Sequence, residues 1–266
     1  MHRALTKTLC LILIRMSRIM PHPQGIVYTT ENGADTILMA FSNPGYSPAL
    51  QAAIDYAWDN GVVLVATTGN DGVNTLTYPA ADRGVIGVSS TDSNDVLASD
   101  SNYGQDVFLA APGVDIVTTN AGGTYTSISG TSAAAAHVAG AAAFMHAFNP
   151  TFTNGVIVGK LARNADAVGT REQTGNRRLN LARTVSDSST ASVKPVGAAP
   201  TGSGGPFVGP YVAAAISFGS VTVSPQVGSL TYGTGGSVTF PVNVNINGSG
   251  GGSLSIALRV GKNITY

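Results

Sequence analysis

Charge and cysteine are both scarce in this sequence, and each scarcity excludes a class of protein. Lysine and arginine number 14 and aspartate and glutamate 14, so 11% of the 266 residues are charged and the net charge is zero. Such a sparse, balanced charge gives no field that attracts nucleic acid or an anionic membrane. The single cysteine, Cys10, excludes a disulfide within the chain. We therefore expect no nucleic-acid partner.

Long apolar runs are lacking at the N-terminus. The run from Leu9 to Ile14 ends at Arg15, whereas a membrane-spanning helix needs about 20 residues. Basic residues precede the run as in a signal peptide, but Arg15 and Arg18 interrupt it and no small-residue cleavage site follows. We expect no membrane span and interpret residues 1–24 as an artificial start, with an atypical leader as the alternative.

The most informative segment is Gly130-Thr131-Ser132, followed by Ala133 to Phe148 without a charged residue. The pattern predicts a helix that ends before Asn149-Pro150 and is buried on all sides. A serine where a strand, Thr124 to Ser129, turns into this helix has a free backbone N–H at the positive end of the dipole. An attacking hydroxyl and its oxyanion require those conditions. The alternative is an N-cap serine.

Two histidines follow on the same helix, and neither suits the role of a base for Ser132. His137 is five residues further on, a rotation of about 500°, and so points away from the serine. We predict that His137 and His146 are buried structural histidines.

A second informative region is Asp35 to Gly72. The apolar runs Asp35 to Phe41 and Gly61 to Ala66 are typical of buried strands, and Ser47-Pro48 begins a helix between them. Asn60-Gly61 is expected to end this helix, and its inner face is expected to carry Leu50, Ile54, Ala57 and Trp58. Strand, helix and strand in this spacing predict a parallel sheet, whose ligands bind beyond the carboxyl ends of the strands. The loops Ser42 to Gly45 and Thr67 to Gly72 follow those ends, although ordinary turn chemistry also explains them.

Four motifs together resemble the subtilisin-like serine protease (subtilase) family, in order from about Gly25 to Val185. They are the nucleophile string Gly130 to Gly140, Ala66 to Asn70, Gly33 to Phe41, and Ala110 to Val114. The resemblance implies an α/β fold, a partial subtilisin-like parallel sheet flanked by helices. It implies Ser132 as nucleophile and Asn70 as oxyanion-hole donor. It also implies a substrate-binding lining of Ala40, Phe41, Ser42, Thr68 and Gly69.

The sequence departs from the family pattern in substrate binding and in the catalytic triad. Ser42 and Asn43 replace a glycine pair, which disfavours close approach of a peptide backbone. The family's acid and base lie earlier in its sequence, and no histidine here has that context; His22, between Pro21 and Pro23, is not expected to begin the required helix. A serine without a base is a weak nucleophile, so we expect this chain to be nearly inactive. The missing N-terminal part of the catalytic domain would complete the triad, and its absence would leave the strand Asp35 to Phe41 with an unpaired edge.

Two functions follow from these expectations. The first is a secreted, extracellular serine endopeptidase of bacterial type that acts on a protein or peptide substrate and is incomplete in this chain. The alternative is a non-catalytic extracellular binding protein on a degenerate protease scaffold.

The domain organisation is predicted as a leader at 1–24, a partial catalytic domain at 25–185, a flexible linker at 186–210 and a β module at 211–266. The linker is rich in serine, glycine, alanine and proline. Alternating segments after it predict a truncated, immunoglobulin-like β-sandwich. No metal site is predicted. Calcium is kept open because aspartates and asparagines cluster in one loop, although a solvated surface explains them better. These residues are Asp92, Asn94, Asp95, Asp100 and Asn102.

Overall fold

The computed structural model describes residues 10–12, 22–196, 207–209, 222–223 and 242–243. The chain divides into two units, residues 1–213 and 214–266. In the second unit, β10 (Thr222–Val223) pairs antiparallel with β11 (Val242–Asn243). The rest of the β-sandwich predicted for 211–266 lies outside the described residues, so that module stays a prediction.

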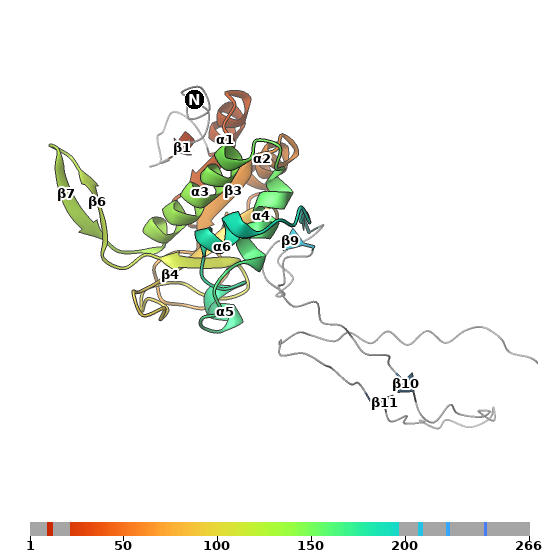
Figure 1. Cartoon of the computed structure of the whole chain (residues 1–266). Coiled ribbons are helices and arrows are strands. Elements are labelled where there is room, and N and C mark those ends of the chain that lie inside the picture. The colour runs from red at the N-terminus through yellow and green to blue at the C-terminus, as the bar shows by residue number, and fades with distance from the viewer. Residues whose placement is uncertain (1–9, 13–21, 197–206, 210–221, 224–241, 244–266) are drawn as a thin grey trace, which may run out of the picture. The chain divides into compact units, whose positions relative to one another are not determined.

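A parallel sheet of five strands, in the order β1-β2-β3-β4-β5, forms the centre of the first unit (Figure 1). Every neighbouring pair is parallel, which confirms the predicted α/β class. Strands β2, β3 and β4 are buried along their whole length, as their apolar sequences predict. The strands are β1 (Cys10–Ile12), β2 (Thr36–Met39), β3 (Val63–Thr67), β4 (Val85–Thr91) and β5 (Leu109–Pro112).

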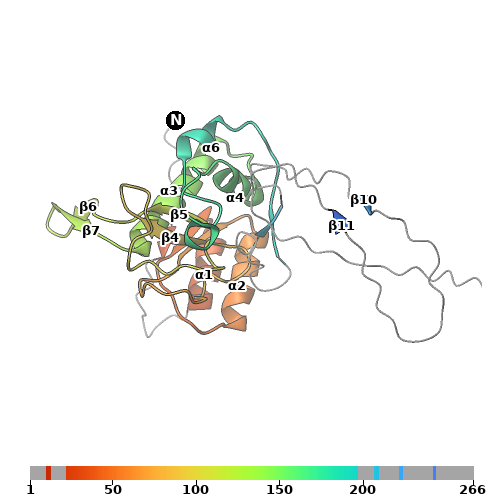
Figure 2. The ribbon, with the colours of Figure 1, turned by 90° about the horizontal axis from the view of Figure 1, so that it is seen from below.

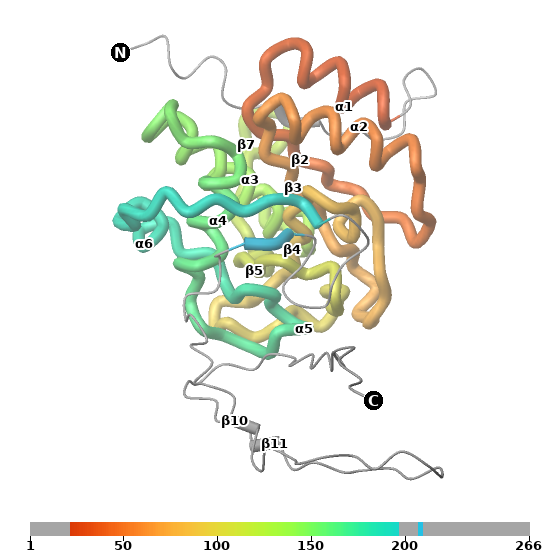
Figure 3. Tube along the Cα trace, turned by 90° about the vertical axis from the view of Figure 1, so that its right-hand side faces the viewer, coloured from red at the N-terminus to blue at the C-terminus, as the bar shows by residue number. Residues whose placement is uncertain are grey.

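Helices cover both faces of this sheet. Helices α1 (His22–Glu31) and α2 (Pro48–Asp59) lie on one face, and α3 (Thr131–Phe148) and α4 (Asn154–Arg163) lie on the other (Figures 2 and 3). Successive side chains of a strand point to opposite faces. Leu64 of β3 accordingly belongs to the core under α1 and α2, whereas Val63 and Val65 belong to the core under α3 and α4.

Helix α2 has the predicted ends. The Ser47 hydroxyl oxygen accepts a hydrogen bond from the Leu50 N–H at 3.3 Å, and Asn60 is the C-cap. Leu50, Ile54 and Ala57 are buried as predicted. Trp58, also expected on the inner face, is half-buried and packs on Phe207 at 5.3 Å between ring centroids.

The outer edge of β2 is not free, so the expected unpaired edge is wrong. β1, from the apolar run that imitates a signal peptide, pairs with β2 in the register Cys10–Ile37, Leu11–Leu38 and Ile12–Met39. The pairing follows from a sequence property: a short apolar run can continue a buried parallel sheet as well as it can resemble a leader.

Two shorter pairs of strands complete the first unit. β6 (Ile116–Asn120) and β7 (Thr124–Ile128) form an antiparallel hairpin that projects from the sheet (Figure 1). Two short helices, α5 (Arg171–Thr174) and α6 (Leu181–Ser186), follow α4. β8 (Lys194–Pro195) pairs with β9 (Phe207–Val208), inside the range 186–210 where we expected a flexible linker.

Residues 187–196 differ from that expectation because they pack against α4. The Arg163 Nε atom lies 2.6 Å from Asp187 Oδ2, and Val193 and Val196 are buried. The Lys160 ammonium, itself buried, donates to the Asp187 backbone oxygen. The composition of this segment did not indicate that it packs on the fold. Its contacts are ion pairs and single apolar side chains, which produce no apolar periodicity in the sequence.

Candidate active site

The start of α3 places Ser132 at the surface. Gly130 is the N-cap and Thr131 the first helical residue, so the N-cap interpretation of Ser132 is wrong. The Ser132 side chain is exposed, and its hydroxyl has no hydrogen-bond partner among the described residues. The helix begins at the carboxyl edge of the sheet, where the Thr67 hydroxyl at the end of β3 contacts the Thr131 hydroxyl.

Asn70, in the loop after β3, is bound to the same helix start. Its Oδ1 accepts hydrogen bonds from the Thr131 N–H and from the Thr131 hydroxyl, both at 2.8 Å. A backbone N–H can only donate, so the oxygen of the carboxamide faces the helix and the Nδ2 group is the free end. Within the described part of the chain, neither Asn70 Nδ2 nor the Ser132 N–H has an acceptor. The structure therefore brings two unused donors to the turn that carries the Ser132 hydroxyl.

The loop that carries Asn70 is held by a buried asparagine, Asn102. Its Oδ1 accepts from the N–H groups of Asp71 (2.9 Å) and Val73 (3.3 Å), and its Nδ2 donates to the Thr68 carbonyl at 3.0 Å. A Cβ at Gly69 would lie 2.6 Å from this Nδ2, so only glycine allows the approach. The sequence suggested only that Asn102 belongs to a solvated acidic loop. Its partners lie about 30 residues away along the chain, so no local pattern indicates that it is buried.

The residues predicted to line the substrate lie around this loop. Ala40 and Phe41 follow β2 and are half-buried, whereas Ser42 is exposed. Ser42 Oγ lies 3.0 Å from where a Cβ at Gly69 would stand, so the two predicted segments meet. Thr68 is buried, and its hydroxyl donates to the Val88 carbonyl at 3.1 Å. Their role toward substrate stays a prediction.

The histidines differ from expectation in two cases. His137 is exposed, not buried, and its Nδ1 lies 3.0 Å from the Ala133 carbonyl oxygen. His22 does begin a helix, α1, because a proline such as Pro23 is tolerated in a first turn; its ring stacks on Phe41 at 4.3 Å. His146 is half-buried, and burial lowers the pKa of its imidazole against the opposing charge of Asp35. Among the described residues, no histidine forms a hydrogen bond with Ser132.

Helix α3 is not buried on all sides, contrary to its composition. Ala136, Gly140, Phe144 and Phe148 recur every four residues and form an exposed stripe, with Phe144 48% and Phe148 53% exposed. We call these four residues the open face of α3. A hollow of about 570 Å³ lies between the first half of this face, at Ala136 and Gly140, and the β6–β7 hairpin, and its lining includes Ala133, the residue after Ser132.

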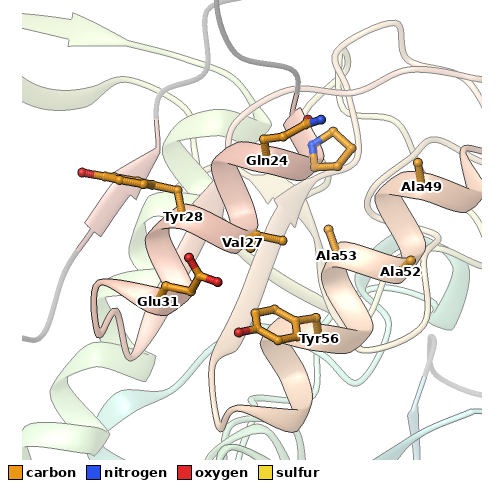
Figure 4. A pocket seen from close by; sticks show the side chains of 9 residues that line it. Gln24, Val27, Tyr28, Glu31, Ala49, Ala52, Ala53 and Tyr56 are labelled. Carbon is orange, nitrogen blue, oxygen red and sulfur yellow. The ribbon is translucent and has the colours of Figure 1, made fainter.

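A second hollow, of about 550 Å³, separates α1 from α2 (Figure 4). In Figure 4 the side chain of Val27 points from α1 toward α2, whereas the ring of Tyr28 points away from α2; Ala53, Glu31 and Tyr56 also line the hollow. Among the described residues that line it there is no serine, cysteine, histidine or lysine. Its described lining therefore lacks a serine or cysteine nucleophile paired with a histidine or lysine base.

The predicted acidic cluster forms contacts within the fold. Asp92 Oδ1 accepts from the N–H groups of Asn94 (2.8 Å) and Val96 (2.9 Å), and Asp95 Oδ1 lies 2.6 Å from Arg178 Nε. In the ranges that the structure describes, no group of three or more metal-ligating side chains occurs. The expectation of no metal site, with calcium as its alternative, stays a prediction.

Two buried carboxylates outside the predicted site were missed. Asp82 and Asp106 are 1% and 0% exposed. Burial, with the nearby charge of Asp55, raises the pKa of Asp82 to about 7. Burial also raises the pKa of Asp106 to about 6, although hydrogen bonds from Thr77 oppose the shift. Both precede apolar strands, and neither has a sequence context that distinguishes it from a surface aspartate.

Comparison with known proteins shows the family of this chain. A model of the subtilase family of peptidases matches residues 18–192. The chain belongs to the subtilase family. It is 40% identical over 161 residues to subtilisin DY of Bacillus licheniformis, covering 59% of each chain, and 36% identical over 157 residues to subtilisin Savinase of Lederbergia lenta, covering 59% of this chain and 58% of that one.

A solved structure gives the same relationship. A protease from Pseudoalteromonas arctica superposes with a TM-score of 0.59 at 30% identity, covering 62% of this chain and 57% of that chain. This subtilase chain therefore spans less than two thirds of the length of the relatives it matches. In the described part of the chain, no helix is long and apolar enough to cross a membrane.

The N-cap glycine of this subtilase gives a first prediction. A Cβ at Gly130 would lie 3.2 Å from Asn70 Nδ2 and 3.3 Å from its Oδ1, at a φ of 134° that side chains rarely adopt. We expect Gly130→Ala to lower the free energy of unfolding by about 1–3 kcal/mol, as measured by urea titration. The control is Gly140→Ala on the same helix, where nothing lies within 4 Å; it should raise stability by about 0.5–1 kcal/mol. Equal effects of the two substitutions would show that Gly130 carries no special strain.

Proposed function

We propose that this chain is the part of a subtilisin-type serine endopeptidase that carries the nucleophile and the oxyanion hole. The Ser132 oxygen attacks the carbonyl carbon of a peptide bond while its proton passes to a base, and the negative oxygen that forms accepts hydrogen bonds from the Ser132 N–H and Asn70 Nδ2. When the C–N bond breaks, the leaving amine takes that proton, and water then hydrolyses the acyl-enzyme. The observation that carries the proposal is a pair of donors without acceptors at the start of α3, the Ser132 N–H and Asn70 Nδ2. The hydrogen bonds from Thr131 to Asn70 Oδ1 hold the Asn70 carboxamide in this place. Donors that are fixed before the reaction lower the barrier without reorganising.

The acid and base of the reaction come, in this proposal, from a further polypeptide segment. The open face of α3 supports this idea, because an apolar stripe beside a nucleophile is costly to leave in water. A segment that covers Ala136, Gly140 and Phe144 would begin to pack where the hollow reaches Ala133, next to Ser132. In the part of the chain that the structure describes, Ser132 has no base, and we expect the chain by itself to be nearly inactive.

A fluorophosphonate probe, which labels only an activated serine, tests the proposal. We expect little or no labelling of the purified chain. A chimera in which residues 25–185 replace the matching stretch of subtilisin DY supplies the family's acid and base, and should be labelled at Ser132 and cleave casein. Ser132→Ala in the chimera should abolish both signals. A chimera that folds, judged by circular dichroism, but takes no label would refute the proposal and favour a binding protein on a degenerate protease scaffold.

We also propose that the protein acts outside a bacterial cell on protein or peptide substrates. The subtilisins it resembles come from bacteria such as Bacillus licheniformis and Lederbergia lenta. The low charge and lack of disulfides are compatible with this location. Detection of the protein in the cell pellet but not in the culture medium of its source would contradict it.

A further inference from the structure

The carboxamide of Asn70 is connected to a second threonine that the reaction does not touch. Thr131 has one hydroxyl proton, and that proton is donated to Asn70 Oδ1 at 2.8 Å. The close contact between the Thr67 and Thr131 hydroxyls therefore requires Thr67 to be the donor. The Thr67 hydroxyl therefore donates to the Thr131 hydroxyl, and the Thr131 hydroxyl donates to Asn70 Oδ1.

The surroundings of this chain of hydroxyls keep it in place. Thr67 and Thr131 are 3% and 0% exposed, so water does not compete for their hydrogen bonds. The Gly69 N–H donates to the hydroxyl oxygens of both Thr67 (3.2 Å) and Thr131 (3.3 Å). With the Thr131 N–H, the carbonyl end of Asn70 receives two hydrogen bonds, which use both its lone pairs.

We propose that Thr67 is a positioning residue for the oxyanion donor: its hydroxyl, acting through Thr131, orients and polarises the Asn70 carboxamide. Hydrogen bonds in a chain strengthen one another in a low dielectric. Electron density drawn toward Oδ1 leaves the Nδ2 protons more positive, and these protons face the side on which charge develops. Thr67 touches neither substrate nor the reacting atoms. The inference rests on the proposed function, which it deepens.

The test compares three variants, first in the full chain and then in the chimera. Thr67→Val keeps the side-chain shape and removes the hydroxyl, whereas Thr67→Ser keeps the hydroxyl. The matched control is Thr184→Val in α6, which also removes a buried hydroxyl; that hydroxyl donates to the carbonyl oxygen of Asn180, the N-cap of the helix, at 2.8 Å. In the full chain labelled with ¹⁵N-asparagine, Thr67→Val should shift the side-chain amide resonances of Asn70, and the other two variants should not.

In the chimera, Thr67→Val should lower kcat for a peptide substrate by about three- to ten-fold with KM unchanged, because the lost hydrogen bond acts on the transition state. Thr67→Ser should restore kcat, and Thr184→Val should leave it unchanged. An unchanged kcat together with unshifted Asn70 resonances would overturn the inference. If the chimera with native Thr67 is inactive, the proposed function fails by itself, and the resonances alone decide whether Thr67 polarises Asn70.

Discussion

In the chimera that supplies the family's acid and base, Asn70→Ala is expected to lower kcat by about 10²–10³-fold. Loss of the oxyanion-hole asparagine in a subtilisin has a cost of that size, and we carry this family value over to Asn70. The reason is geometric: Thr131 fixes Oδ1, so Nδ2 is held ready and alanine offers no replacement donor. KM should change little, since the donor acts on charge that is absent from the ground state.

The measurement is the steady-state hydrolysis of a chromogenic peptide by chimeras of equal purity and fold. Asn94→Ala is the control, because Asn94 is an exposed asparagine in the loop between β4 and β5 and should not affect kcat. Asn70→Asp separates orientation from donation, since it keeps an oxygen for the Thr131 N–H but loses the donor. If the Asn70→Ala chimera were as active as its parent, Asn70 would have no role in the mechanism. Thr67 would then have no oxyanion donor to position.

Local sequence patterns predicted the elements that local interactions determine. The cap at Ser47, the C-cap at Asn60 and the end of α3 before Pro150 each depend on neighbouring residues, and the structure has all three. The GTS string at Gly130 predicted where the turn into α3 lies. None of these local patterns contains information on what packs against a helix. The exposed stripe on α3 and the exposure of His137 were therefore missed.

Long-range contacts account for the other differences. Asn102 and Thr67 act on the site through hydrogen bonds to residues 31 and 64 positions away, and nothing in their neighbours distinguishes them from turn residues. The pairing of Cys10–Ile12 with β2 was missed because the leader interpretation removed that run from the sheet. The buried acids were missed for the same reason, since burial depends on the fold around them and not on adjacent residues.

The second large effect is on stability and concerns the buried carboxylate of Asp82. Asp82→Asn is expected to stabilise the protein above pH 7 by roughly 2–4 kcal/mol. The pKa of Asp82 is raised to about 7 by burial, and neither carboxylate oxygen has a hydrogen-bond partner among the described residues. A shift of about three pKa units corresponds to about 4 kcal/mol, and the unpaired amide of the replacement reduces the gain.

The sign of the pH dependence follows from the proton balance. Between about pH 4 and pH 7 the folded protein keeps a proton on Asp82 that the unfolded chain has released, so stability falls as pH rises through this window. Asp106, with its pKa raised to about 6, also lowers the stability as pH rises, and its contribution is complete at a lower pH than that of Asp82.

Urea unfolding at pH 5 and pH 8 should therefore show a loss of stability for the parent chain and a smaller loss for Asp82→Asn. The exposed Asp100, replaced by asparagine, should behave as the parent does. If Asp82→Asn is instead less stable than the parent at pH 8, the charged form of Asp82 must be stabilised by a bound cation or by a rearranged loop, because a bare buried carboxylate has no other way to favour the folded state.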